Sequence, residues 1–285
     1  MVMKSGKPEG TALRVVCIAE EPIEQVPYIA AAPGSKGIFY EWLPIYWGEM
    51  LGLPDGVEAL IVTSDLQGIA GHEFYGGRDN KLVGEELPET LDLLLRCSLP
   101  DVNPARVIVL LCGDLYADPF KRGSSGDPLP VWKAFHRHFG TVVGVAGNHD
   151  LFTGEGIAEL EAAQGIDFYS EPKIAVHGGM IVAGLGGVTG RAGKPNRMAE
   201  ADYLGFLQKL LRKGPHVLML HQGPDVPAAG LPGHAGTREA LEAAPPLLVC
   251  CGHVHWEQSL AELENGTQVL NADGRVLVFT AASLD

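Results

Sequence analysis

The sequence predicts a layered α/β domain, and three observations lead to that prediction. The chain has 285 residues, of which 46% are hydrophobic, so it can bury a large core. Short apolar runs of strand length alternate with segments of helical periodicity. Near the C-terminus, Asn265-Gly266 and Asp273-Gly274 separate apolar runs, as in tight hairpin turns. One large domain that packs helices on strands is therefore expected.

The predicted strands are apolar runs bounded by polar or turn-forming residues, and the predicted helices have apolar residues three or four positions apart. Two of the helices are expected to begin at a proline, which a first helical turn tolerates because its N–H would be unpaired there. The strands are expected at residues 13–19, 59–64, 106–112, 141–146, 180–185, 216–220 and 247–251, and the helices at residues 88–97, 130–139, 197–213 and 237–244.

Charge and cysteine content restrict the class of protein. The formal net charge of −14 repels polyanions, so we expect no long nucleic acid as a partner. The five cysteines are an odd number, and all but Cys97 lie in apolar runs, which favours reduced core thiols over disulfides. No apolar stretch reaches membrane-spanning length, and the N-terminus lacks the apolar segment of a signal peptide. These features predict a cytoplasmic protein with no membrane partner.

Side chains that bind metals follow five of the predicted strands. Each of them alone has an ordinary structural explanation, such as a helix N-cap, a turn residue or a buried histidine. Together they are more informative, because the carboxyl ends of strands in α/β sheets are where loops converge and ligands bind. A mixture of carboxylate, amide and imidazole groups suits a two-metal hydrolase. These residues are Asp65, Asp114, Asn148, His221 and the pair His253 and His255.

In chain order, these residues form a series that resembles the calcineurin-like metallophosphoesterases. The series is Asp65-Leu-Gln67, Gly113-Asp114, Gly147-Asn148-His149-Asp150, His221 and Gly252-His253-Val254-His255. Residues 234–238 and 266–271 are also similar to the end of the small archaeal and bacterial members. The resemblance implies a four-layer α/β/β/α fold, in which helices flank a sandwich of two sheets. Residues 1–57 would be an N-terminal extension packed on the core, and residues 58–285 the metallophosphoesterase domain.

The resemblance also implies a role for each site residue. Two divalent ions, Mn, Fe or Zn, would lie about 3.5 to 4 Å apart and share a hydroxide that attacks the phosphorus. His149 would be the general acid that protonates the leaving group. Asp114 would bridge the two ions. The other implied metal ligands are Asn148, His221 and His253 at one ion, and Asp65, Gln67 and His255 at the other. Gln67 stands where the family has histidine.

The chain departs from the family pattern around its first metal site and its catalytic histidine. An amide at Gln67 is a weaker ligand than imidazole, and His72 in the next loop is an alternative source of the nitrogen. The carboxylate that orients the catalytic histidine in the family is expected at Ala117, whereas the chain has Asp118 one position later. Either Asp118 orients His149 through a shifted loop, or His149 has no carboxylate partner.

The first metal-binding strand opens the chain in the family, but here more than fifty residues precede Asp65. An alternative alignment places residues 17–20 at that position, although Asp65 follows the better strand. The extension also contains an aromatic cluster that either seats it on the sandwich, covers the metal site as a lid, or forms a homodimer contact. This cluster is Phe39, Tyr40, Trp42, Tyr46 and Trp47.

The function predicted from these residues is metal-dependent hydrolysis of small phosphomonoesters or phosphodiesters. Arg238 is a candidate for substrate binding, because a guanidinium at a helix N-terminus can hold phosphate, although an exposed helix arginine is an equal alternative. A nucleotide or cyclic-nucleotide phosphodiesterase is a second hypothesis. A third is a catalytically weak metal-binding scaffold whose first metal site, at Gln67, has degenerated.

Overall fold

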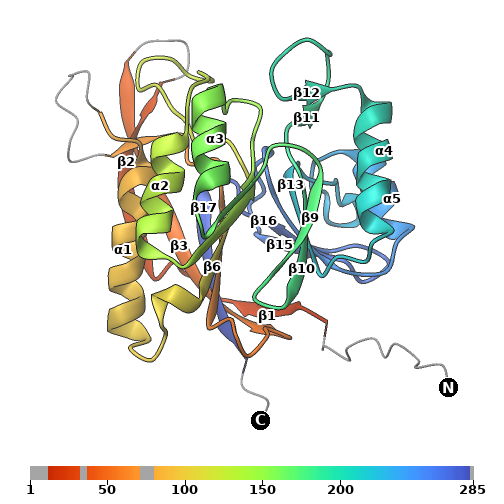
Figure 1. Ribbon diagram of the computed structural model, residues 1–285, viewed down its shortest axis with the longest axis horizontal. Helices are drawn as coiled ribbons and strands as arrows, with labels where there is room; N and C mark the ends of the chain where they lie inside the picture. Colours follow the sequence, from red (N-terminus) through yellow and green to blue (C-terminus); the bar gives the residue numbers. More distant parts are fainter. Residues whose placement is uncertain (1–11, 33–36, 71–79, 283–285) are drawn as a thin grey trace.

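Two β-sheets lie face to face at the centre of the protein, and helices cover the outer face of each sheet (Figure 1). The computed structural model describes residues 12–32, 37–70 and 80–282. The layers are visible in Figure 1 as a group of helices on one side, the strands in the middle and a second pair of helices on the other side.

The first sheet has nine strands, and the four strands at one end of it are parallel, as expected where helices cover one face. β4, β6, β7 and β8 run parallel to one another, and β17 runs antiparallel to β4. The order is β5 (Ile69–Ala70), β2 (Glu24–Ala31), β3 (Ile38–Leu51), β17 (Arg275–Ala281), β4 (Ala59–Ser64), β6 (Val107–Leu111), β7 (Thr141–Val145) and β8 (Ile166–Tyr169), with β1 (Arg14–Ile18) paired to β3.

The second sheet has six strands and again a parallel centre, formed by β10, β13, β14 and β16. Its order is β15 (Leu260–Glu262), β16 (Gln268–Asn271), β14 (Leu248–Gly252), β13 (Val217–Gln222), β10 (Met180–Leu185) and β9 (Lys173–His177). A small parallel pair, β11 (Val188–Thr189) and β12 (Arg197–Met198), lies apart from both sheets.

Three apolar clusters hold the layers together, and they confirm the four-layer α/β/β/α arrangement. One lies between the first sheet and the helices α1 (Val83–Ser98), α2 (Leu129–His138) and α3 (Gly154–Ala162). A second fills the space between the two sheets. The third lies between the second sheet and the helices α4 (Glu200–Leu211) and α5 (Ala235–Glu242). None of the described helices combines the length and apolarity that crossing a bilayer requires.

The predicted strands and helices are all found, but two helix starts and one hairpin turn are wrong. Asn265-Gly266 joins the antiparallel strands β15 and β16, whereas Asp273-Gly274 connects β16 of the second sheet to β17 of the first and forms no hairpin. α1 begins at Val83, not at Pro88, because the Glu85 side chain accepts the Leu82 N–H and caps the helix before the proline. α4 begins at Glu200, because Arg197 and Met198 pair with Val188 and Thr189 as a strand. The strands and α-helices that the sequence did not predict are β2, β3, β5, β8, β9, β11, β12 and α3.

The described N-terminal residues extend the first sheet. β3 pairs with β17 on one side and with β1 and β2 on the other, so these strands continue the hydrogen-bonded ladder of the core. The boundary at residue 58 stays a prediction. Within the aromatic cluster, Tyr40 and Trp42 are 67% and 58% exposed, and a homodimer contact through them stays a prediction.

The structure also decides between the two alignments of the first metal-binding strand. β4 pairs directly with β6, which places Asp65 next to Asp114, whereas β1 pairs with β3 at a distance from both. All five cysteines are free, but Cys17 is exposed rather than buried, because the pairing of β1 with β3 shifts register between the buried Val15 and Cys17.

Candidate metal centre

The predicted ligands meet where the parallel strands of both sheets end. Asp114 follows β6 of the first sheet, His221 lies near the end of β13 in the second, and His253 follows β14. Ligand atoms of these three side chains all lie within 4.8 Å of one another. The two sheets therefore form the centre jointly, and neither sheet alone supplies the ligands.

The backbone at these positions is held in an unusual conformation. Among the described residues, four that are not glycine have positive φ, and three of them are predicted ligands: Asp65 (54°), Asp114 (54°) and His253 (70°). Such conformations cost free energy and cluster at functional sites. A Cβ on Gly147 would overlap the Asp114 carboxylate, and one on Gly252 would overlap the Asp65 carboxylate. Gly147 and Gly252 are thus required because the ligand side chains lie too close to leave room for another side chain.

Two buried polar atoms in this centre have no hydrogen-bond partner, Asn148 Oδ1 and His221 Nε2. His221 Nδ1 lies 2.9 Å from the Cys112 carbonyl oxygen, so Nδ1 donates and Nε2 is the atom left for a proton or a metal ion. His221 Nε2 is 3.3 Å from Asp114 Oδ2, close but without hydrogen-bond geometry. An amide oxygen, an imidazole nitrogen and a carboxylate that converge unpaired fit a divalent metal ion.

The charges of the centre also favour a cation. Burial, together with Asp273 and Asp114, raises the pKa of Asp65 well above its usual range. Burial lowers the pKa of His221, but the Asp114 carboxylate outweighs it and brings the pKa to about 10. Burial and the neighbouring His221 lower the pKa of His253 to about 4, so this ring is neutral and its nitrogens are free to bind metal. The buried carboxylates need positive charge, which a proton on His221 or a metal ion supplies.

The second group of predicted ligands, Asp65, Gln67 and His255, is more open. Asp65 Oδ2 accepts the His253 N–H at 2.9 Å and the Ser64 hydroxyl at 2.7 Å. Gln67 Nε2 lies 3.3 Å from Asp114 Oδ2, and a rotated amide would present Oε1 on the same side. The His255 side chain is 67% exposed. His72, the alternative ligand, lies outside the described residues.

His149 is attached to the centre through its backbone and to a neighbouring loop through its ring. Its N–H donates to Asp114 Oδ1 at 2.7 Å, and its Nδ1 lies 3.1 Å from Ser125 Oγ. Asp118 Oδ1 accepts the N–H of Phe120 instead. Of the two alternatives for this histidine, the structure favours the one without a carboxylate partner, and a hydroxyl takes that place.

Three residues of the centre were not assigned a role from the sequence. Asp150 accepts the N–H groups of Gly147, Asp114 and Leu115, and so fixes two ligand loops together. Its position at the end of the Gly-Asn-His-Asp motif was a usable signal. Asp273 Oδ2 lies 2.9 Å from His255 Nδ1, although the sequence indicated only a turn there.

The third residue is Asn196, in the loop before β12, and no sequence signal marked it. With a φ of 51°, it donates through Nδ2 to the carbonyl oxygens of Gly147 and Asp150. It therefore holds both ends of the Gly-Asn-His-Asp loop in place.

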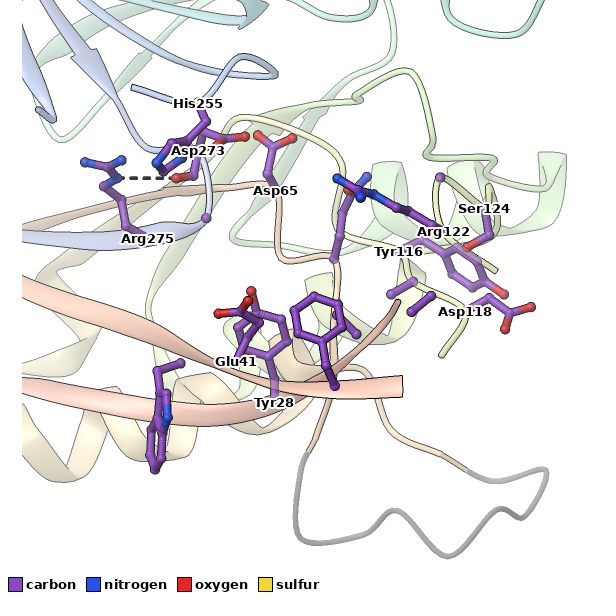
Figure 2. A pocket seen from close by; sticks show the side chains of 18 of the residues that line it. Tyr28, Glu41, Asp65, Tyr116, Asp118, Arg122, Ser124, His255, Asp273 and Arg275 are labelled. Atoms are coloured by element: carbon purple, nitrogen blue, oxygen red, sulfur yellow. Dashed lines mark hydrogen bonds and ion pairs between the residues drawn. The ribbon is translucent and has the colours of Figure 1, made fainter. Parts of the chain in front are cut away.

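A cleft of about 580 Å³ opens beside Asp65, Gln67 and His255 (Figure 2). Strands β2 and β3 form one side, and the loop that follows Asp114 forms the other. Arg238 is not among the cleft residues, and its guanidinium lies 2.9 Å from both Asp225 and Glu242. These carboxylates occupy the group, so phosphate binding by Arg238 stays a prediction that the geometry does not favour.

Comparison with known proteins agrees with this arrangement. A family model described as calcineurin-like phosphoesterase matches residues 59–257. No curated protein matches the chain. Among solved structures, the chain is similar to a protein of unknown function from Aquifex aeolicus, with 17% identity over 77% of this chain and 95% of that chain and a TM-score of 0.33. It is also similar to phosphopantetheinyl hydrolase from Mycobacterium tuberculosis, with 14% identity over 76% and 89% of the two chains and a TM-score of 0.44. The chain is also similar to NAD nucleotidase from Haemophilus influenzae, with 15% identity. This similarity covers 76% of this chain and 44% of that chain, with a TM-score of 0.41.

Proposed function

Because the chain belongs to the calcineurin-like phosphoesterase family, we propose that its metal centre hydrolyses small phosphomonoesters or phosphodiesters. Membership of the family makes it a metal-dependent phosphoric ester hydrolase; the size and type of ester are the proposal. The observation that carries it is the convergence of Asp114, His221 and His253 within 4.8 Å, beside the unpaired buried oxygen of Asn148. The site is thus built for a cation at the meeting point of both sheets.

The site residues would act either as metal ligands or as the general acid. Divalent ions, when bound, supply positive charge for the phosphoryl oxygens and make water a better nucleophile. Asn148, His221 and His253 would hold one ion, Asp65, Gln67 and His255 the other, and Asp114, which contacts groups of both sets, would be shared. His149 would donate a proton to the leaving oxygen through Nε2, because Ser125 occupies its Nδ1.

The experiment that tests this function is a panel of chromogenic phosphate monoesters and diesters, assayed with added Mn and again after chelation, alongside metal analysis. Metal-dependent turnover of any ester supports the enzyme. Bound metal without turnover of any ester favours the scaffold hypothesis instead. Comparing monoesters with diesters in the same panel identifies which type of ester the site prefers.

A further inference from the structure

One wall of the cleft comes from residues outside the part of the chain that matches the family, residues 59–257. Tyr28 pairs directly with Glu41, and Ala30 with Phe39, across the antiparallel strands β2 and β3. Directly paired residues share a face of a sheet, so Tyr28, Phe39 and Glu41 present two aromatic rings and a carboxylate to the cleft. The wall adjoins the metal centre, because a Cβ on Gly68 would overlap the Tyr28 ring.

The opposite wall is the loop that follows Asp114, and its two lining cations, Lys121 and Arg122, outnumber its one lining carboxylate, Asp118. Lys121 and Arg122 line the cleft, and no ion pair within the described part of the chain involves either side chain. Figure 2 shows the Arg122 side chain extending across the cleft toward the side where Asp65 lies, above Tyr28 and Glu41. Two unpaired cations at this place are notable in a chain with a net charge of −14. They favour an anionic group beside this loop, whereas most of the carboxylates of the cleft lie on other segments.

This cationic loop also reaches the proposed acid. A Cβ on Gly123 would lie 3.8 Å from His149 Cε1, and Ser125 contacts His149 Nδ1. The loop that carries Lys121 and Arg122 therefore packs against the His149 ring, close to the metal centre. Tyr116, whose ring packs on Gly126, adds a third aromatic side chain on the same side.

We propose that the cleft binds the leaving nucleotide of a nucleoside 5′-diphosphate, an inference that rests on the proposed phosphoesterase function. The terminal phosphate would lie at the metal centre and the inner phosphate at Arg122 and Lys121. Glu41 would accept hydrogen bonds from the ribose hydroxyls, and the base would stack on the aromatic side chains. Water forms the new bond to the terminal phosphorus and loses a proton to solvent, and the bond from that phosphorus to the bridging oxygen breaks. The nucleoside monophosphate leaves as an anion, because its phosphate has a pKa of about 6 and needs no proton from His149. The products are inorganic phosphate and a nucleoside monophosphate.

Three substrates separate the parts of this proposal: ADP, pyrophosphate, which lacks the nucleoside, and p-nitrophenyl phosphate, which lacks the second phosphate. With Mn, kcat/KM is expected to be highest for ADP. Phe39→Ala is expected to lower the ratio of kcat/KM for ADP to that for pyrophosphate roughly tenfold, the scale of one lost base–aromatic stack. Glu41→Gln is expected to lower the same ratio. Arg122→Gln is expected to lower the ratio of kcat/KM for ADP to that for p-nitrophenyl phosphate. Tyr40→Ala is the matched control, because Tyr40 neighbours Phe39 on β3 but is 67% exposed and outside the cleft.

The outcomes distinguish failure of this inference from failure of the proposed function. If p-nitrophenyl phosphate turns over but ADP is no better a substrate than pyrophosphate, or Phe39→Ala leaves both ratios unchanged, the nucleotide assignment is wrong. If no ester turns over with Mn, the phosphoesterase function is wrong, and calorimetric titration with ADP then tests the cleft directly. Binding by the wild type that weakens in Phe39→Ala and Arg122→Gln, but not in Tyr40→Ala, supports the cleft assignment; absence of binding overturns it.

Discussion

The two halves of the metal centre differ in how firmly the fold holds them. In the buried half, Asp114, Asn148 and His221 are 2%, 6% and 0% exposed, and they lie at or next to the ends of central strands. In the open half, His255 is 67% exposed, and Gln67 replaces an imidazole with an amide. Ligands that packing has already fixed lose little freedom when a metal binds, whereas exposed ones must be ordered by it. The difference predicts a tightly held ion in the buried half and an exchangeable ion in the open half.

Asp114 joins the two halves, so its replacement should have the largest effect. Its Oδ2 lies 3.3 Å from both His221 Nε2 and Gln67 Nε2, and its Oδ1 accepts the His149 N–H. Asp114→Asn is expected to lower kcat/KM on the order of 10³-fold or more, because both ions and the acid depend on this carboxylate. Thermal unfolding should show the fold intact. Asp118→Asn, on the same loop, is the control and should keep most activity; turnover by Asp114→Asn at the wild-type rate would refute the shared ligand.

Replacing His149 is expected to lower the rate of hydrolysis without changing the metal content. Replacing a ligand in either half would change the metal content. His149→Ala should lower kcat for esters with alkyl alcohol leaving groups by about 10²-fold or more, the usual contribution of a general acid. The loss on p-nitrophenyl phosphate should be much smaller, because nitrophenolate leaves without a proton. Metal content, measured by elemental analysis, should stay at the wild-type level. Equal losses on both types of ester, or loss of metal, would show that His149 is not the acid.

The sequence predicted candidate ligands in both halves but not all of the residues that hold those ligands in place, for a physical reason. Asp114, Asn148, His221 and His253 come at or just after the ends of buried parallel strands, and such strands are recognisable as short apolar runs. The partners of the open half depend on tertiary contacts between distant segments. Asp273 reaches His255 because β16 pairs with β14, and Asn-Ala-Asp-Gly alone indicates only a turn. The strands β2 and β3, which form a wall of the cleft, were missed because each contains a proline, Pro27 or Pro44, which argues against a strand in the sequence.

Gln67 should determine how many ions remain bound after purification. An amide oxygen binds borderline divalent ions less firmly than imidazole, so the wild type is expected to retain about one ion per chain after exhaustive dialysis. Activity should then rise as Mn is added. Gln67→His should retain two ions and need less added Mn. Two tightly held ions in the wild type would contradict the weak site, and if His72→Ala then removed one of them, His72 would be the missing ligand.

The smallest effect is expected from Asp273, whose side-chain hydrogen bond to the open half is made to His255. A metal-binding histidine commonly donates its other N–H to a carboxylate, which fixes the ring and strengthens the metal bond. Asp273 Oδ2, at 2.9 Å from His255 Nδ1, is placed for that role and leaves Nε2 for the ion. Asp273→Asn should raise the Mn concentration needed for half-maximal activity about tenfold, the lower end of such effects, while the tight ion stays bound. Glu257→Gln removes a charge from the same cleft without touching this hydrogen bond, so it separates orientation from net charge. An equal shift in both variants would mean that Asp273 acts only through its charge, and loss of the tight ion in Asp273→Asn would mean that the two halves are not independent.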